Sequence, residues 1–113
     1  MKVRLQMSQE ATTCRLTGAL DLEAQRELDA SLASLERGRV VFEISDVPLV
    51  DSAGLGVLLH AVRHVRSGGG KAVICCAKPS VRRVLKAVVV PSNASVFGDE
   101  AAAMSYLVPA RAA

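Results

Sequence analysis

Aromatic residues are scarce in this chain of 113 residues, where Phe42, Phe97 and Tyr106 make up the 3% that is aromatic. Proteins that bind single-stranded nucleic acids stack bases on several aromatic rings that are interleaved with basic residues. Here 14 Lys and Arg face 11 Asp and Glu, and the basic residues are scattered along the chain, so the net charge is only +3. The composition therefore argues against stacking platforms for bases or sugars and against direct binding of nucleic acid.

Long hydrophobic runs are also missing. The sequence contains no run of 18 apolar residues, which a membrane-spanning helix would need. It has no cationic start followed by an apolar stretch and a small-residue cleavage site, which a secretory signal would show. We therefore expect a cytoplasmic protein without a membrane span.

Cysteine is present in an odd number, as Cys14, Cys75 and Cys76. An odd count leaves at least one thiol unpaired within the chain. If Cys75 and Cys76 are successive residues of a strand, their side chains point to opposite faces and are poor partners for each other. We expect reduced, partly buried thiols.

Half of the residues are apolar, and they are mainly Ala, Val and Leu, with two Ile. Such a composition is typical of helices packed on a sheet in a single layer. The length fits one domain spanning residues 1–113, with a core over about 3–107 and a frayed tail at 108–113.

Hydrophobic periodicity predicts the order of the elements. Alternation at period two predicts an antiparallel hairpin, and apolar residues at helical spacing then alternate with short apolar runs. The predicted strands cover 3–7, 13–17, 39–44, 71–76 and 95–97, and the predicted helices cover 22–35, 52–67, a segment opened by Pro79, and 99–107. This order indicates an α/β fold: a mixed sheet of about five strands with about four helices, mostly on one face.

Helix boundaries are predicted from capping and turn residues. Aspartate is a favoured N-cap, so Asp21 and Asp99 are the predicted caps of the first and last helices. Gly38 is the predicted stop of the first helix, and the glycines at 68–70 end the second. A loop is predicted at 91–94.

The segment Asp51-Ser52-Ala53-Gly54-Leu55-Gly56 follows a central strand and opens a helix. Unpaired backbone N–H groups and the helix dipole favour an anion there by about 0.3 to 2 kcal/mol. The small residues leave the hydroxyl of Ser52 accessible to another protein. The simpler alternative is that Ser52 only caps the helix.

Catalytic and metal motifs fail at specific positions. A nucleophile elbow would require glycine where the chain has Val50. His60 and His64 are spaced like two metal ligands on a helix, but no third ligand lies within sequence reach. The run 68–71 looks like a phosphate loop, but the required earlier glycine is Val65. We therefore expect no catalytic residues, no metal and no cofactor.

The ordered motifs resemble the STAS family of anti-sigma factor antagonists. They are Gly-Ala-Leu-Asp-Leu at 18–22, Val-Phe-Glu-Ile-Ser-Asp-Val at 41–47, Leu-Val-Asp-Ser-Ala-Gly-Leu-Gly-Val-Leu-Leu at 49–59 and Gly-Gly-Lys at 69–71. The resemblance runs in order over nearly the whole chain. The chain departs from the family at Glu43, where aspartate is usual, and at 87–93, which lacks the usual Gly-Leu turn.

The resemblance implies a phosphorylation switch. Ser52 would be phosphorylated by a partner of the histidine-kinase-like ATPase type that is both anti-sigma factor and serine kinase, and a serine phosphatase would reverse the mark. Unphosphorylated, the domain would bind the anti-sigma factor and free the sigma factor. The residues implied in partner binding are Asp21, Asp51, Ser52, Ala53, Gly54 and Gly56.

Two alternatives remain open. The chain could be a STAS accessory subunit that docks constitutively on a membrane transporter or a signalling complex, with Ser52 only a helix cap. It could also bind a small molecule, although the sequence shows no recognisable pocket chemistry. Phosphorylation of Ser52 distinguishes the switch from the constitutive subunit.

Overall fold

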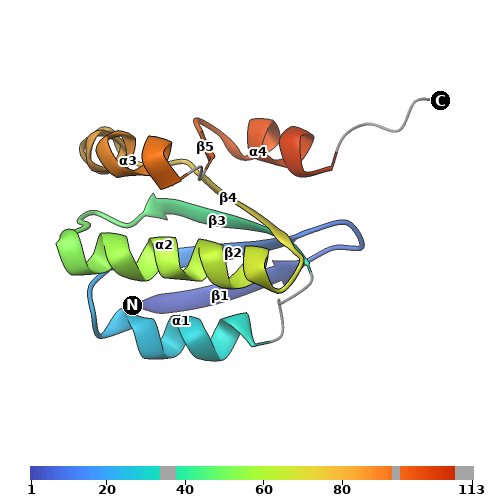
Figure 1. The fold of residues 1–113 in the computed structure, drawn as a ribbon, viewed down its shortest axis with the longest axis horizontal. Helices are drawn as coiled ribbons and strands as arrows, with labels where there is room; N and C mark the ends of the chain where they lie inside the picture. Colours follow the sequence, from blue (N-terminus) through green and yellow to red (C-terminus); the bar gives the residue numbers. More distant parts are fainter. Residues whose placement is uncertain (34–37, 93–94, 109–113) are drawn as a thin grey trace.

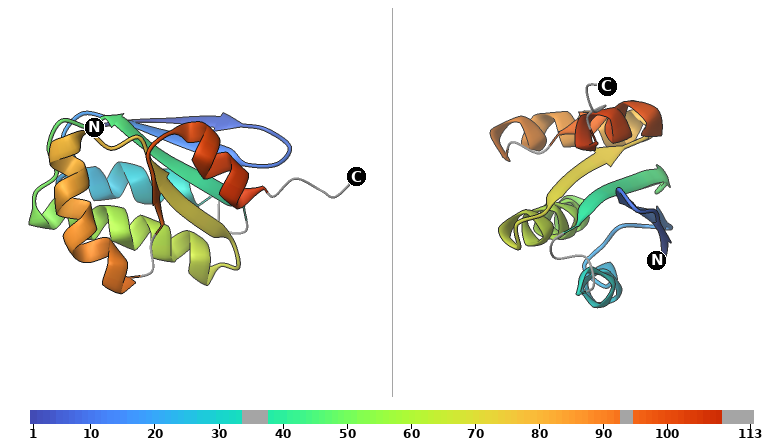
Figure 2. Two further views of the ribbon diagram at one scale, coloured as in Figure 1. Left: turned by 90° about the horizontal axis from the view of Figure 1, so that it is seen from above. Right: turned by 90° about the vertical axis from the view of Figure 1, so that its right-hand side faces the viewer.

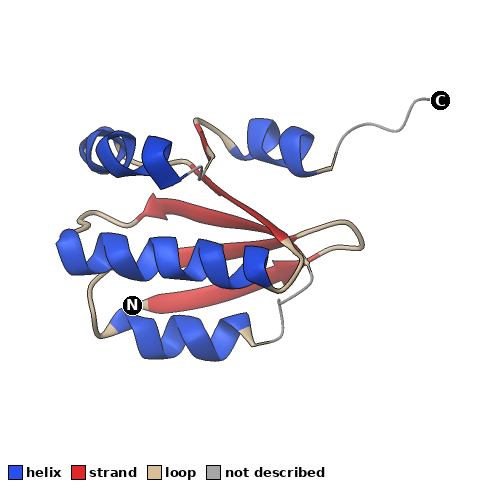
Figure 3. Ribbon diagram, viewed as in Figure 1, coloured by secondary structure: helices blue, strands red, loops and turns tan. Residues whose placement is uncertain are grey.

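The computed structural model describes residues 1–33, 38–92 and 95–108. Helices and strands follow one another in the predicted order (Figures 1 and 3). The elements are β1 (Lys2–Met7), β2 (Thr12–Thr17), α1 (Ala24–Leu32), β3 (Arg39–Asp46), α2 (Ser52–Ser67), β4 (Lys71–Cys75), α3 (Pro79–Ser92), β5 (Val96–Phe97) and α4 (Glu100–Leu107).

The strands form one mixed sheet in the order β1-β2-β3-β4-β5. β1 and β2 are the predicted antiparallel hairpin, and β2, β3, β4 and β5 pair in parallel. Parallel crossovers are right-handed nearly without exception, so a sheet in sequential order places its three crossover helices on one face. Figure 2 shows α1 and α2 together on one side of the sheet and α4 on the other. The predicted fold class is confirmed.

The face under the crossover helices carries the larger core. Cys14, Phe42 and Ile74 are neighbours across β2, β3 and β4, and none of them is exposed. Buried residues of all three crossover helices pack in the same cluster: Ala24, Leu28 and Leu32 of α1, Leu55, Val57, Leu58, Leu59, Ala61, Val62 and Val65 of α2, and Val81 and Leu85 of α3.

The opposite face, under α4, is built differently. Because side chains alternate along a strand, the residues that follow Cys14, Phe42 and Ile74 point to this face. They are Arg15, Glu43 and Cys75, again neighbours across the sheet. A smaller apolar cluster surrounds Cys75 and consists of Val41, Val73, Ala103 and Leu107.

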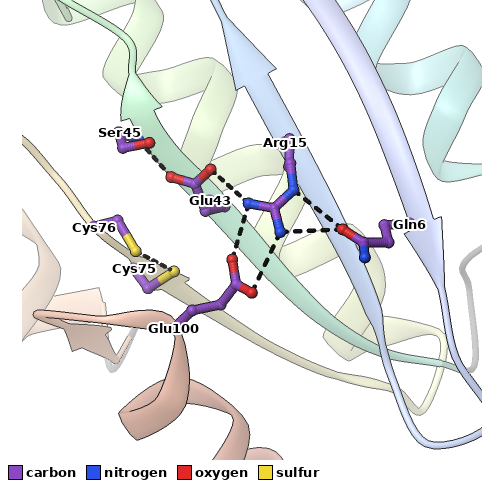
Figure 4. A network of polar contacts seen from close by, with 7 residues as sticks. All are labelled: Gln6, Arg15, Glu43, Ser45, Cys75, Cys76 and Glu100. Atoms are coloured by element: carbon purple, nitrogen blue, oxygen red, sulfur yellow. Dashed lines mark hydrogen bonds and ion pairs between the residues drawn. The ribbon is translucent and has the colours of Figure 1, made fainter.

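Arg15 is the centre of a polar network on this face (Figure 4). Its guanidinium lies 3.0 Å from Oε2 of Glu43 and 2.9 Å from Oε1 of Glu100, and it also donates to Oε1 of Gln6 at 3.0 Å. Glu43 accepts a further hydrogen bond from the backbone N–H of Ser45 at 2.7 Å. Glu100 is the first residue of α4, so the network joins α4 to β1, β2 and β3.

The pKa of the Glu43 carboxyl lies below its ordinary value. Burial opposes ionisation, since only 6% of the residue is exposed. The hydrogen bonds from Ser45 and Arg15 and the charge of Arg15 together outweigh this burial. The ionised form is therefore the stable one in the fold.

The first helix begins later than predicted. Ala24 and Gln25 donate to the carbonyl oxygens of Asp21 and Leu22, three residues earlier in each case. These bonds form a tight turn before α1, and Glu23 is the N-cap. Asp21 is therefore not the cap of α1, although its Oδ1 accepts from Ala24 N–H at 3.2 Å.

Other predicted boundaries also differ. α3 includes Pro91 and Ser92, so the loop predicted at 91–94 is wrong for its first half. Proline disfavours a helix because it lacks the N–H and crowds the carbonyl four residues earlier, so its residue type predicted a loop where the helix continues. β4 ends at Cys75, one residue earlier than predicted. Residues 34–37, just before the predicted stop at Gly38, as well as 93–94 and the predicted tail at 109–113, lie outside the described residues.

The predicted cap of the last helix is confirmed. Asp99 has extended backbone, and its Oδ1 accepts from the N–H of Ala102 at 2.7 Å. This is the usual N-cap geometry, which satisfies one of the free N–H groups in the first turn of a helix.

Candidate functional site at the start of α2

Asp51, and not Ser52, is the N-cap of α2. Asp51 has extended backbone, its Oδ1 accepts from Gly54 N–H at 2.6 Å, and its carbonyl accepts from Leu55 N–H at 2.8 Å. The interpretation of Ser52 as the helix cap is therefore wrong. Ser52 is the first residue of the helix and is exposed to solvent, and the capping hydrogen bond does not use its hydroxyl.

A neighbouring segment holds the start of α2 in place. Leu20 and Val50 form a parallel β-bridge, and Leu20 N–H donates to the carbonyl of Leu49 at 3.2 Å. In this parallel register, Asp21 follows Leu20 just as Asp51 follows Val50. The bridge therefore brings both acidic residues to the end of the sheet at which β2 and β3 finish and α2 begins.

Gly54 lies against the backbone of Leu20. A Cβ atom at this position would lie 1.7 Å from the carbonyl oxygen of Leu20, so only glycine fits without a shift of the backbone. At Gly56 a Cβ would meet nothing within 4 Å. The two glycines, both predicted to contact a partner, therefore differ: Gly54 is buried and fixes the packing, while Gly56 is exposed.

The exposed surface around Ser52 combines small, acidic and apolar residues. Asp51, Ser52, Ala53 and Gly56 are exposed, and Asp21 is half-buried. Two large apolar side chains close to them in the chain, Leu22 and Leu49, are 65% and 70% exposed and were not among the predicted partner residues. Their positions directly after Asp21 and two residues before Asp51 are the only signal of them in the sequence.

Other chemistry is sparse in the described ranges 1–33, 38–92 and 95–108. No group of three or more His, Cys, Asp or Glu residues there has the arrangement of a metal site. No helix in these ranges has the length and hydropathy needed to cross a membrane. His60 lies 3.7 Å from Oδ1 of Asp29, so it faces α1.

Comparison with known proteins identifies the family to which the chain belongs. The family model of the STAS domain matches residues 2–103, so the chain belongs to the STAS domain family. The chain is 22% identical over 111 residues to the anti-sigma F factor antagonist of Paenibacillus polymyxa, with 95% of each protein covered.

Solved structures share the fold. The unphosphorylated form of the anti-sigma factor antagonist SpoIIAA superposes with a TM-score of 0.69 at 20% identity, covering 96% of this chain and 100% of that one. The phosphorylated form of SpoIIAA from Bacillus gives a TM-score of 0.66, also at 20% identity, over 93% and 98%. The STAS domain of a SulP transporter from Vibrio cholerae gives 0.65 at 17% identity, over 89% and 83%.

Proposed function

We propose that the chain is a cytoplasmic anti-sigma factor antagonist that is switched off by phosphorylation of Ser52. The main support is that two adjacent residues have separate roles at the start of α2. Asp51 supplies the cap of α2, and Ser52 presents an exposed hydroxyl at the first position of the helix. Relatives that are named anti-sigma factor antagonists support this role.

The chain is the substrate of the phosphorylation. Oγ of Ser52 attacks the γ-phosphorus of ATP held by the partner; the new O–P bond forms as the bond to ADP breaks, and the hydroxyl proton passes to a base of the partner. We assign the nucleotide, its Mg²⁺ and the base to a serine kinase of the histidine-kinase-like ATPase type. A serine phosphatase hydrolyses the ester and restores the hydroxyl.

Phosphorylation changes the surface charge at one point. The ester adds about −1.5 to −2 charges beside the carboxylates of Asp51 and Asp21. The free N–H groups of the first turn and the helix dipole favour the phosphate, so we expect the domain to keep its fold. A partner that packs on this surface meets added bulk and negative charge, and a penalty of about 2.7 kcal/mol weakens binding about a hundredfold.

Leu22 and Leu49 are the proposed apolar anchors of the partner surface. Each is more than half exposed, and the two flank the acidic pair of Asp21 and Asp51. Complete burial of a leucine side chain contributes about 1.5 to 3 kcal/mol, so the two can supply a useful part of the binding energy. Together with Ser52, Ala53 and Gly56, they make up the partner surface that we propose, with Asp21 and Asp51 as its acidic residues.

Intact-mass analysis after incubation with the partner kinase and ATP tests the phosphoacceptor. We expect one phosphate on the wild type and none on Ser52→Ala, which still binds the partner. Ser80→Ala is the matched control, because Ser80 is also exposed in the first turn of a helix, α3. Phosphate on the Ser52→Ala protein would exclude the assignment.

Capture experiments test the switch against a constitutive accessory subunit. We expect an ATPase of the kinase type to be retained by immobilised wild-type chain and Ser52→Ala, and lost with Ser52→Asp. A transporter component that the wild type and Ser52→Asp retain equally would support the constitutive subunit instead. The cap function that this alternative gave to Ser52 belongs to Asp51.

A further inference from the structure

Cys75 and Cys76 have their sulfur atoms side by side. β4 ends at Cys75, and Cys76 has a φ of 67°, in the left-handed region that residues other than glycine rarely adopt. This backbone turns the second side chain back toward the first, and the two Sγ atoms lie 3.0 Å apart (Figure 4). The expectation that the two thiols point to opposite faces is therefore wrong.

The backbone at Cys76 costs energy. The left-handed conformation destabilises an ordinary residue by about 1 to 2 kcal/mol, and such strained positions cluster where a protein has chemistry to perform. The strain lies at the one residue whose turn brings the two thiols together.

The two thiols have different access to solvent. Cys75 is fully buried in the cluster under α4, whereas Cys76 is half-buried at its border. Cys14, the third thiol, is fully buried in the larger core on the other face of the sheet. A small reagent therefore reaches Cys76 first, with Cys75 as its immediate neighbour.

We propose that Cys75 and Cys76 form a reversible vicinal disulfide by exchange with a low-molecular-weight disulfide. The Cys76 thiolate attacks one sulfur of the reagent, whose S–S bond breaks and releases one thiolate. Cys75 attacks Sγ of Cys76, and the departing sulfur of the reagent takes the Cys75 proton and leaves as a thiol. The pair of cysteines loses two protons and two electrons, and the reagent is reduced to two thiols.

Geometry explains why this bond is reversible. Adjacent Cα atoms lie about 3.8 Å apart across a trans peptide, whereas disulfides usually join Cα atoms about 4.4 to 6.8 Å apart. The closed ring is therefore strained, and strained disulfides are more easily reduced than structural ones. The oxidation state of the pair therefore follows the ratio of small disulfides to thiols in the surrounding solution.

The electrostatics set the speed of the first step. Burial raises the pKa of Cys76, the hydrogen bond with Cys75 lowers it in part, and the charges of Glu43, Glu100 and Asp99 raise it further. Burial also raises the pKa of Cys75 above its ordinary value. Only the thiolate attacks, so exchange is slow near neutral pH and accelerates as the pH rises.

Oxidised glutathione is the probe for the test. After incubation, blocking of free thiols and tryptic digestion, residues 72–82 form one peptide that contains both cysteines and excludes Cys14. We expect this peptide to lack both blocking groups and to be lighter by two hydrogen atoms, in the wild type and in Cys14→Ala. Dithiothreitol should restore both thiols.

The single variants separate the two steps. Cys75→Ala should trap glutathione as a stable mixed disulfide on Cys76, and Cys76→Ala should leave Cys75 reduced. Glutathione that stays on Cys76 of the folded wild type, or covalent dimers linked through Cys76, would overturn the proposal. The assay needs no kinase or partner, so its outcome is independent of the Ser52 switch.

Discussion

The two faces of the sheet are built on different principles. The face under α1, α2 and α3 holds the larger apolar core. The face under α4 has a small apolar cluster and a charged network around Arg15. Hydrophobic burial therefore holds the three crossover helices, whereas α4, which follows the last strand, depends on ion pairs as well.

Truncation of one leucine on each face should show the largest difference. Leu58 in α2 and Leu107 in α4 are both completely buried. Leu58→Ala leaves a cavity inside a densely packed core and should cost about 2 to 5 kcal/mol of unfolding free energy. Leu107→Ala should cost less, because α4 is the last helix and can shift to fill the space.

Chemical denaturation of the two variants measures this difference. Amide hydrogen exchange should also show that Leu107→Ala speeds exchange mainly in α4, whereas Leu58→Ala affects the whole sheet. An equal loss of stability with global exchange in both variants would contradict the comparison.

Added volume at the start of α2 should have the next largest effect. Gly54→Ala forces the backbone away from the Leu20 carbonyl, and overpacking of this kind costs about 1 to 3 kcal/mol. Gly56→Ala is the matched control; it meets no atom and should stabilise the helix by up to about 1 kcal/mol. Thermal unfolding of both variants checks the prediction, and a stable Gly54→Ala protein would contradict it.

The charged network should make the face under α4 sensitive to acid. The folded pKa of Glu43 is lowered, so its contribution is complete above the unfolded pKa of about 4.3 and is lost as the pH falls through the lower folded pKa. Glu43→Gln should cost about 1 to 2 kcal/mol at neutral pH, since it removes the charge but keeps the shape.

The pH profile of stability measures this contribution directly. Below about pH 4.3 the wild type should lose stability faster than Glu43→Gln, and the two curves should converge. Parallel curves down to the acid limit would show that Arg15 does not favour the ionised carboxylate.

Removal of the two helix caps should have the smallest effects. One cap belongs to a helix on each face of the sheet. Asp51→Ala removes the cap of α2 and Asp99→Ala removes that of α4, and each should cost about 0.5 to 2 kcal/mol. Asparagine at either position should retain most of the stability. In urea unfolding, the free energy of unfolding of Ser52→Ala should lie within about 0.5 kcal/mol of the wild-type value. A loss as large as that of Asp51→Ala would show that Ser52 is the cap.

Local patterns in the sequence predicted the regular elements well. The leucine and valine spacing and the following glycines gave α2 its observed bounds, and Asp99 was recognised as a cap. The choice between Asp51 and Ser52 failed because both residue types are good caps and the propensities do not separate them.

Features that depend on distant parts of the chain were not predictable. Arg15 contacts Glu43 and Glu100, which lie 28 and 85 residues later in the chain, and no local periodicity predicts such contacts. The bridge between Leu20 and Val50 is equally non-local, and it aligns the acidic residues at the site. The turn at Cys76 was also not predicted, although it is local, because it ends β4 within a run of residues whose pattern predicts a strand.

The contact between Gly54 and the Leu20 carbonyl has a consequence for the kinetics of partner exchange. It joins the segments that bear Asp21 and Ser52, so the surface does not need to be assembled during an encounter. Rigid surfaces of this kind associate at ordinary rates, and changes within them act mainly on dissociation. We therefore expect a phosphate on Ser52 to shorten the lifetime of the complex while leaving the rate of its formation within about tenfold.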